Sequence, residues 1–155
     1  MRHFFMYWKA RVVDAELAEE KELGHGFDHN AGGNLWKVEP DDTLWVATIR
    51  KGHLVLVGRL IVGERVTYET ARRRLKGRNL YPSKYHVLPR AGSVQPIREI
   101  ESSNLASDLR FKSKVNDRLA VNDGKVSAMQ LQAMRELTPE SARLLRKTWE
   151  DRDPA

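Results

Sequence analysis

Two apolar stretches dominate the pattern of hydrophobic and polar positions along the chain. They cover residues 43–49 and 53–62, with a short polar break at 50–52 that contains glycine. Both contain Val, Ile and Leu, the first also contains Thr and Trp, and this arrangement is typical of an antiparallel β-hairpin. The second stretch is almost continuously apolar, which indicates a strand buried on both faces or one in a closed barrel. Gly58 interrupts it, as glycine often does at a bulge. We expect this hairpin to be the centre of the sheet.

Shorter apolar segments predict further strands on either side of the hairpin. The N-terminal segment is aromatic, and its side chains should alternate between two faces as they do in a strand. The other segments are brief and are bounded by turn residues. These predicted strands cover residues 3–9, 84–88, 96–100 and 109–111.

Helices are predicted where apolar residues recur at helical spacing next to capping residues. One lies within residues 12–23, and another covers 67–76, where Thr67 is a plausible N-cap. Near the C-terminus, residues 127–137 and 138–149 predict a pair of helices, the second with proline at its first position.

Length, charge and cysteine content narrow the class of protein. The 155 residues fit one α+β domain over 1–155, with 121–150 as a helical C-terminal extension. A net charge of +6 is compatible with a polyanionic partner such as DNA or RNA. The absence of Cys excludes disulfides, thiol catalysis and Cys-ligated zinc. No apolar run reaches the roughly 20 residues of a membrane span, so we expect a cytoplasmic protein without a membrane partner.

The GK[ST] motif of phosphate-binding loops and the GxSxG motif of serine hydrolases are both absent. The remaining candidate for catalysis is a loop with two histidines and an aspartate. His25 and His29 are four residues apart with Asp28 between them, but Gly24 and Gly26 argue against the helix that would align them. A metal-dependent nuclease or nucleotide hydrolase using this loop is one alternative function. A protein-interaction or regulatory domain is a second. We expect no cofactor.

Recognition chemistry is concentrated in the loop at residues 27–36. Asn side chains both donate and accept hydrogen bonds, so they can read the edge of a base. The faces of Trp rings can stack on a base, although they can equally fill a core. The candidate base-contacting residues are Tyr7, Trp8, His29, Asn30, Asn34, Trp36 and Trp45.

A cluster of arginines in and after the predicted helix at 67–76 offers phosphate contacts. The members are Arg72, Arg73, Arg74 and Arg78. Cations also suit the C-terminal end of a helix, so a solvated basic face is the other interpretation. Tyr81, Tyr85 and His86 follow in the next loop and are further candidates for base stacking.

Over roughly residues 3–63 the sequence resembles the EVE domain of the PUA-like superfamily, which is related to the ASCH and YTH domains. The resemblance consists of Tyr7-Trp8, an Asn-Ala-x-x-Asn-Leu loop that begins at Asn30, and the glycine-interrupted strand VLVGRLIVGE. The family loop reads approximately RNxxARN, whereas Arg is absent before Asn30 and Gly33 replaces the second Arg. Pro40-Asp41-Asp42 replaces the Gly-Asp turn of the family.

The resemblance implies a small pseudo-barrel of mixed strands with flanking helices, and a pocket that accepts a base flipped from DNA or RNA. By position, that pocket would include Trp8, Asn30, Asn34 and Trp36. The leading hypothesis is therefore a non-catalytic nucleic-acid-binding module that reads a modified base and works with a separate effector protein.

Overall fold

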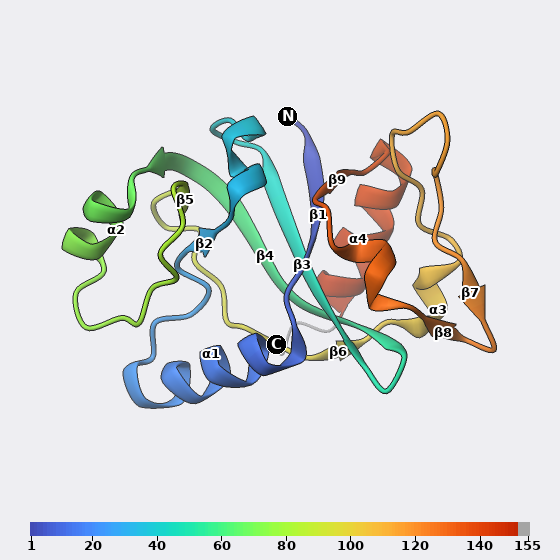
Figure 1. Cartoon of the computed structure of the whole chain (residues 1–155), viewed down its shortest axis with the longest axis horizontal. Coiled ribbons are helices and arrows are strands. Elements are labelled where there is room, and N and C mark those ends of the chain that lie inside the picture. Colours follow the sequence, from blue (N-terminus) through green and yellow to red (C-terminus); the bar gives the residue numbers. More distant parts are fainter. Residues whose placement is uncertain (152–155) are drawn as a thin grey trace.

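A mixed β-sheet forms the centre of the molecule in the computed structural model, which describes residues 1–151 (Figure 1). The fold is α+β, as expected. The strands of this sheet are β1 (His3–Tyr7), β2 (Asn30–Ala31), β3 (Thr43–Arg50), β4 (His53–Val66), β5 (His86–Pro89), β6 (Ile100–Glu101) and β9 (Arg135–Glu136). They follow the order β2-β5-β4-β3-β1-β9, and β6 pairs with β4. A separate small hairpin consists of β7 (Val121–Asn122) and β8 (Lys125–Val126).

Helices pack around the sheet and along its edges. The α-helices are α1 (Ala10–Leu23), α2 (Tyr68–Arg74), α3 (Ser103–Ala106) and α4 (Pro139–Asp151). Two short 3₁₀ helices are η1 (Gly33–Lys37) and η2 (Ala128–Leu131). The predicted helices at 12–23 and 67–76 are confirmed as α1 and α2. The Thr67 hydroxyl caps α2 by accepting a hydrogen bond from the Thr70 amide at 3.2 Å.

The predicted hairpin is confirmed as the centre of the sheet. β3 and β4 pair antiparallel from Thr43–Ile61 to Arg50–His53. β4 continues to Val66, and its other edge pairs with β6 and then with β5. Within residues 1–151 the sheet is nevertheless open, because its end strands β2 and β9 do not pair with each other. Of the two interpretations of the second apolar stretch, burial on both faces is therefore confirmed and the closed barrel is wrong.

Two layers of core cover the two faces of the sheet, because neighbouring side chains of a strand point to opposite sides. Phe4 and Met6 of β1 belong to one layer, which α1 covers with Val13. Phe5 belongs to the other layer, which α4 covers with Trp149. α1 and α4 accordingly lie on different sides of the sheet (Figure 1). Burial on both faces explains the nearly continuous apolar sequence of β4.

The prediction of two C-terminal helices is correct for the second helix only. α4 begins at Pro139, as the proline at the first helical position predicts. Residues 127–137 do not form one continuous α-helix, however, and contain the short 3₁₀ helix η2 and the strand β9 instead. The backbone of β9 pairs with the free edge of β1, while Leu131, Met134 and Leu137 are still buried. Apolar residues three apart therefore reach the core here without a continuous helix.

Two of the predicted short strands are smaller than expected. Only Ile100 and Glu101 pair in the region of 96–100. The segment at 109–111 makes two isolated bridges, from Arg110 to Arg118 and from Phe111 to Leu137. The strand predicted at 84–88 is present as β5.

Gly58 lies at the predicted bulge, where the register of β3 and β4 shifts between Val46 and Ala47. The Phe27 ring covers Gly58 so closely that a Cβ atom there would lie 2.1 Å from Phe27 Cδ2. The same ring contacts the Trp8 indole at 5.2 Å between centroids. The missing side chain of Gly58 thus lets the loop before η1 pack directly on the sheet and reach the end of β1.

Gly58→Ala should lower the free energy of unfolding by about 1–3 kcal/mol, because the new methyl group would overlap the Phe27 ring. Urea unfolding followed by Trp fluorescence measures the change. Gly33→Ala is the matched control, since a Cβ atom at that position meets no other group within 4 Å. Equal stability of the two variants would contradict a tight contact between Phe27 and Gly58.

Candidate functional site

A cavity of about 610 Å³ lies where the end of β1, the start of α1, β2 and the loop at residues 79–82 meet. We call it the Trp8 cavity. Four residues singled out in the sequence line it, although they come from two distant segments: Tyr7, Trp8, His29 and Asn30. Glu16, Asn79 and Tyr81 also line it.

The indole of Trp8 is held in one orientation at the cavity wall. Its Nε1 atom donates a hydrogen bond to Asn30 Oδ1 at 3.2 Å, and Phe27 packs against its ring. The side chain is only partly buried, so it also borders the cavity. A ring that is fixed and partly open is suited to stacking on a flat ligand.

Asn30 supports this wall and is almost completely buried, with 1% of its surface exposed. Its Oδ1 atom accepts hydrogen bonds from Trp8 Nε1 and from the Ala31 amide at 2.8 Å. Its Nδ2 atom donates to Met6 Sδ at 3.3 Å. Both acceptor positions of the carbonyl oxygen are therefore used. The structure assigns Asn30 to positioning Trp8, and not to the reading of a base edge by its carbonyl oxygen.

A buried cluster of charges lies behind the cavity and fixes the segments that form it. Arg78 Nη2 donates to Glu16 Oε2 at 2.8 Å, and the same guanidinium contacts Glu19 and Asp28. His29 Nδ1 lies 3.1 Å from Asp28 Oδ1. Arg78 thereby connects α1, the loop that carries His29, and the chain after α2.

The carboxyl groups of this cluster have shifted pKa values in opposite directions. Burial alone would raise the pKa of Asp28, but hydrogen bonds from His29 and Arg78 outweigh burial and hold it below its ordinary value. Burial raises the pKa of Glu16, and the neighbouring His29 and Arg78 oppose that rise without cancelling it. Glu16, which borders the cavity, therefore takes up a proton more readily than an ordinary Glu.

The predicted phosphate-binding arginines do not act as one group. Only 4% of the Arg78 side chain is exposed, and its partners are carboxylates, so it is not available to a phosphate. The three arginines of α2 are exposed beside β5, at the edge of the molecule (Figure 1). Arg74 pairs with Glu64, and Arg72 lies over the ring of Tyr68. None of the three lines the Trp8 cavity.

The His25–Asp28–His29 loop forms part of a salt-bridge cluster. His25 Nδ1 lies 2.5 Å from the Gly26 carbonyl oxygen, and Asp28 binds both His29 and Arg78. The guanidinium of Arg78 already contacts Glu16, Glu19 and Asp28, and it offsets part of their negative charge. Over residues 1–151, no group of three His, Asp or Glu side chains is placed to hold a metal ion.

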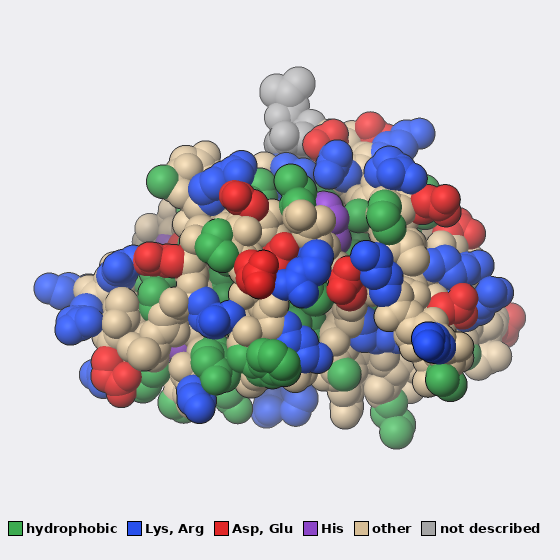
Figure 2. Space-filling model, turned by 90° about the horizontal axis from the view of Figure 1, so that it is seen from above, with side chains coloured by type: hydrophobic (Ala, Val, Ile, Leu, Met, Phe, Trp, Pro, Cys, Tyr) green, Lys and Arg blue, Asp and Glu red, His purple; other side chains and the backbone are tan. Residues whose placement is uncertain are grey.

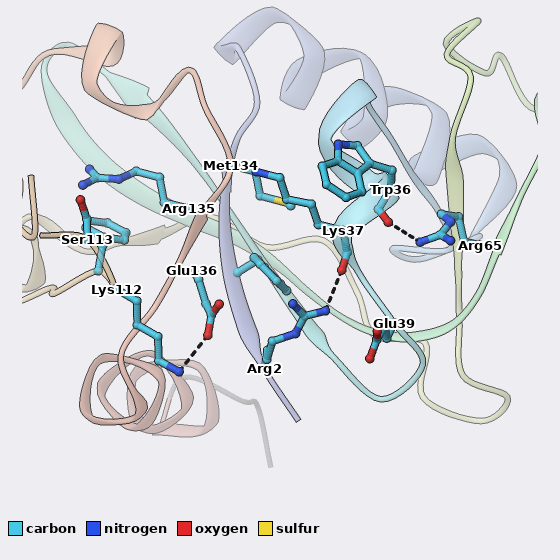
Figure 3. Close-up of a pocket in the computed structure, with 12 residues that line it drawn as sticks. Arg2, Trp36, Lys37, Glu39, Arg65, Lys112, Ser113, Met134, Arg135 and Glu136 are labelled. Carbon is cyan, nitrogen blue, oxygen red and sulfur yellow. Dashed lines mark hydrogen bonds and ion pairs between the residues drawn. The ribbon is translucent and has the colours of Figure 1, made fainter.

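The remaining candidates lie outside the Trp8 cavity. Trp45 is completely buried, and its Nε1 donates to His3 Nδ1 at 3.1 Å, so its ring is not available to a base. Asn34 is exposed on η1, and so is Trp36, with 56% of its surface accessible. Trp36 borders a second hollow of about 730 Å³ (Figure 3), which we call the Trp36 cleft.

Sequence reasoning missed Glu16 and Asn79 as residues of the Trp8 cavity. Glu16 occurs in a run of charged residues that is indistinguishable from a solvated helix face. Asn79 reaches the cavity only because Arg78, its neighbour, is drawn towards α1 by carboxylates. The sequence around neither residue indicates that it would border a cavity. Tyr81 was visible as a stacking candidate and is 72% exposed at the cavity.

Comparisons with protein-family models, curated proteins and solved structures find no match to this chain. The resemblance to the EVE domain therefore stays a prediction. No helix within residues 1–151 combines the length and apolar character needed to cross a bilayer.

Asp28→Asn should lower the free energy of unfolding by about 1.5–3 kcal/mol near neutral pH, because the charged acceptor of two hydrogen bonds is lost. A lowered pKa means that the Asp28 carboxylate stabilises the native state above its ordinary value of 3.8 and that this contribution disappears as the pH falls further. The difference from the native protein should thus be constant at mildly acidic pH and shrink below 3.8.

Urea unfolding across a pH series measures this difference. Asp108→Asn is the control, since Asp108 is exposed and makes no ion pair within residues 1–151. A loss that is the same at all pH values would contradict the role of the Asp28 charge.

Proposed function

We propose that this chain is a non-catalytic nucleic-acid-binding module of the EVE and PUA-like type, and that the Trp8 cavity accepts a base turned out of its strand. The observation that carries the proposal is the meeting of Tyr7, Trp8, His29 and Asn30 at one cavity. A module of this kind would work with a separate effector protein.

Stacking supplies part of the free energy that such binding requires. Turning a base out of a stacked helix costs a few kcal/mol, and a base on a Trp ring regains about 1–3 kcal/mol. The indole of Trp8 is held by Phe27 and Asn30, so little conformational freedom is lost when a ligand stacks on it.

Polar groups of the cavity can select the base, including a modified one. Glu16 Oε2 is bound to Arg78, while Oε1 has no hydrogen bond within residues 1–151. An ionised Glu16 would accept from the amino or imino groups of a base, and a protonated Glu16 would donate instead. Asn79 on the opposite segment can do both.

Cations at the same cavity favour a phosphate-bearing ligand over a free base. Lys9 and Arg11 belong to its wall, and they lie one and three residues after Trp8 in sequence. Contacts of Lys and Arg with phosphate give an attraction that is independent of sequence and falls with salt. They would hold the backbone while Trp8 and Glu16 contact the base.

The hydrolase alternative has less support from the geometry. Asp28 and Glu16 are both tied to the guanidinium of Arg78, and Asp28 also to His29. Hydrogen bonds already engage the carboxylate that would have to position a metal ion or take a proton. The arrangement favours a rigid wall for binding over a reactive group.

Trp8→Ala should weaken binding of a base-modified oligonucleotide by roughly five- to a hundredfold, through loss of one stacked base. Fluorescence anisotropy with labelled DNA and RNA, unmodified and modified, across a salt series measures this. Asn30→Ala should show the same loss of preference, because Asn30 holds the Trp8 indole. Met129→Ala, an exposed apolar residue that does not line the Trp8 cavity, is the control.

Salt-dependent binding that ignores both the modification and Trp8→Ala would leave only attraction to a basic surface. Failure to bind any oligonucleotide at low salt would contradict the proposed function as a whole.

A further inference from the structure

The Trp36 cleft lies between η1 and β4 on one side and β9 with residues 111–113 on the other. In Figure 3, Trp36 and Arg65 lie to one side of β1, and Lys112 and Arg135 lie to the other. Lys and Arg side chains with carboxylates between them also spread across the molecular face seen in Figure 2. The charged residues of the cleft are Arg2, Lys37, Arg65, Lys112 and Arg135, with Glu39 and Glu136.

Three of these cations form no ion pair within residues 1–151: Lys37, Arg65 and Arg135. Arg135 donates a hydrogen bond to the Asn116 carbonyl oxygen, and the nearby Asp117 carboxylate attracts its charge. Arg2 pairs with Asp42, and Lys112 pairs with Glu136 at 2.9 Å. Backbone carbonyl oxygens hold Arg65 instead, because its Nη1 donates to Trp36 and Val38 at 2.7 and 2.8 Å. The cleft therefore has positive charge that its own acidic residues leave uncompensated.

Aromatic rings place the other two cations beside apolar surface. The guanidinium of Arg135 lies 3.9 Å from the centroid of the Phe111 ring, and Lys37 Nζ lies 5.7 Å from that of Trp36. These contacts hold the charges in place without neutralising them. They leave the cations able to meet an anion.

Trp36 gives the cleft a second kind of binding group. It is the indole with the largest exposed fraction among residues 1–151, and it lies among the cations. A large exposed ring beside unpaired cations matches a ligand that offers both flat faces and phosphates. Bases inside a duplex are stacked on one another and cannot cover such a ring, whereas those of a single strand can.

The Trp36 cleft and the Trp8 cavity border opposite ends of β1. Phe4 borders the cleft, Trp8 borders the cavity, and both side chains belong to the same core layer. Four residues of a β-strand span about 13 Å. With about 3.4 Å of helix axis per nucleotide of one strand, this distance corresponds to a few nucleotides.

We propose that the Trp36 cleft binds a single-stranded segment next to the flipped base, with one base on Trp36 and phosphates on Lys37, Arg65 and Arg135. The inference rests on the proposed function and adds its substrate class, which is an unpaired strand. It also divides the binding between two sites: the Trp8 cavity selects the base, and the Trp36 cleft binds the neighbouring nucleotides of the same strand.

The test measures anisotropy with a labelled single strand of about 12 nucleotides and with the duplex of the same sequence. The native protein should bind the single strand more tightly. Trp36→Ala should weaken single-strand binding roughly five- to a hundredfold, and equally for modified and unmodified strands. Lys37→Gln and Arg135→Gln should each reduce the slope of log affinity against log salt by about 0.7.

Lys125→Gln is the matched control, because it removes the same charge from exposed β8, away from the cleft. Unchanged single-strand binding in the Trp36 and Lys37 variants, while Trp8→Ala still abolishes the base preference, would overturn this inference and leave the proposed function intact. Equal affinity for duplex and single strand would also overturn it. So would stronger competition by an acidic polypeptide than by the unlabelled strand.

Discussion

The close contact between Phe27 and Gly58 is the constraint on which the site depends. Only a residue without a side chain lets the Phe27 ring approach β4 this closely. The ring then contacts Trp8, and Trp8 binds Asn30. The bulge in the central hairpin and the wall of the Trp8 cavity are therefore one continuous packing arrangement. A change in the core of the sheet would move the indole that borders the cavity, although no ligand touches that core.

On the polar side of the site, Arg78 holds the surrounding segments together as Phe27 does on the apolar side. Buried charges are costly, and they are tolerated when each has partners. The guanidinium meets Glu16, Glu19 and Asp28, which joins α1 to the loop before η1. The cluster determines where His29 and Asn79 lie, and it sets the unequal proton affinities of Asp28 and Glu16. The rigidity of the cavity wall and the shifted proton affinity of Glu16 thus have a common origin.

Local patterns made much of the fold predictable, whereas long-range partners did not. The central hairpin, the Thr67 cap and the start of α4 at Pro139 follow from neighbouring residues alone. β9 replaced an expected helix because the free edge of β1 supplies its hydrogen bonds, and no local pattern reveals that edge. At the site, Trp8, Trp36 and Trp45 looked equivalent in sequence. Their different surroundings depend on the tertiary fold: Trp8 follows β1 and borders the cavity, Trp36 lies on η1 at a separate cleft, and Trp45 of β3 is in the core.

The parallel pairing of β1 with β3 has a consequence for the order of folding. β1 leaves the ribosome before either of its neighbours, β3 and β9, which begin at Thr43 and Arg135. Its aromatic side chains must therefore wait for partners that are made much later, and such non-local pairing is slow to form. The β3–β4 hairpin joins strands that are adjacent in sequence, so it can form first, and β1 then pairs with the free edge of β3. Trp8 follows β1 directly, and the wall of the cavity extends to Pro82, so the cavity cannot form before β3, β4 and the loop at residues 79–82 have been made.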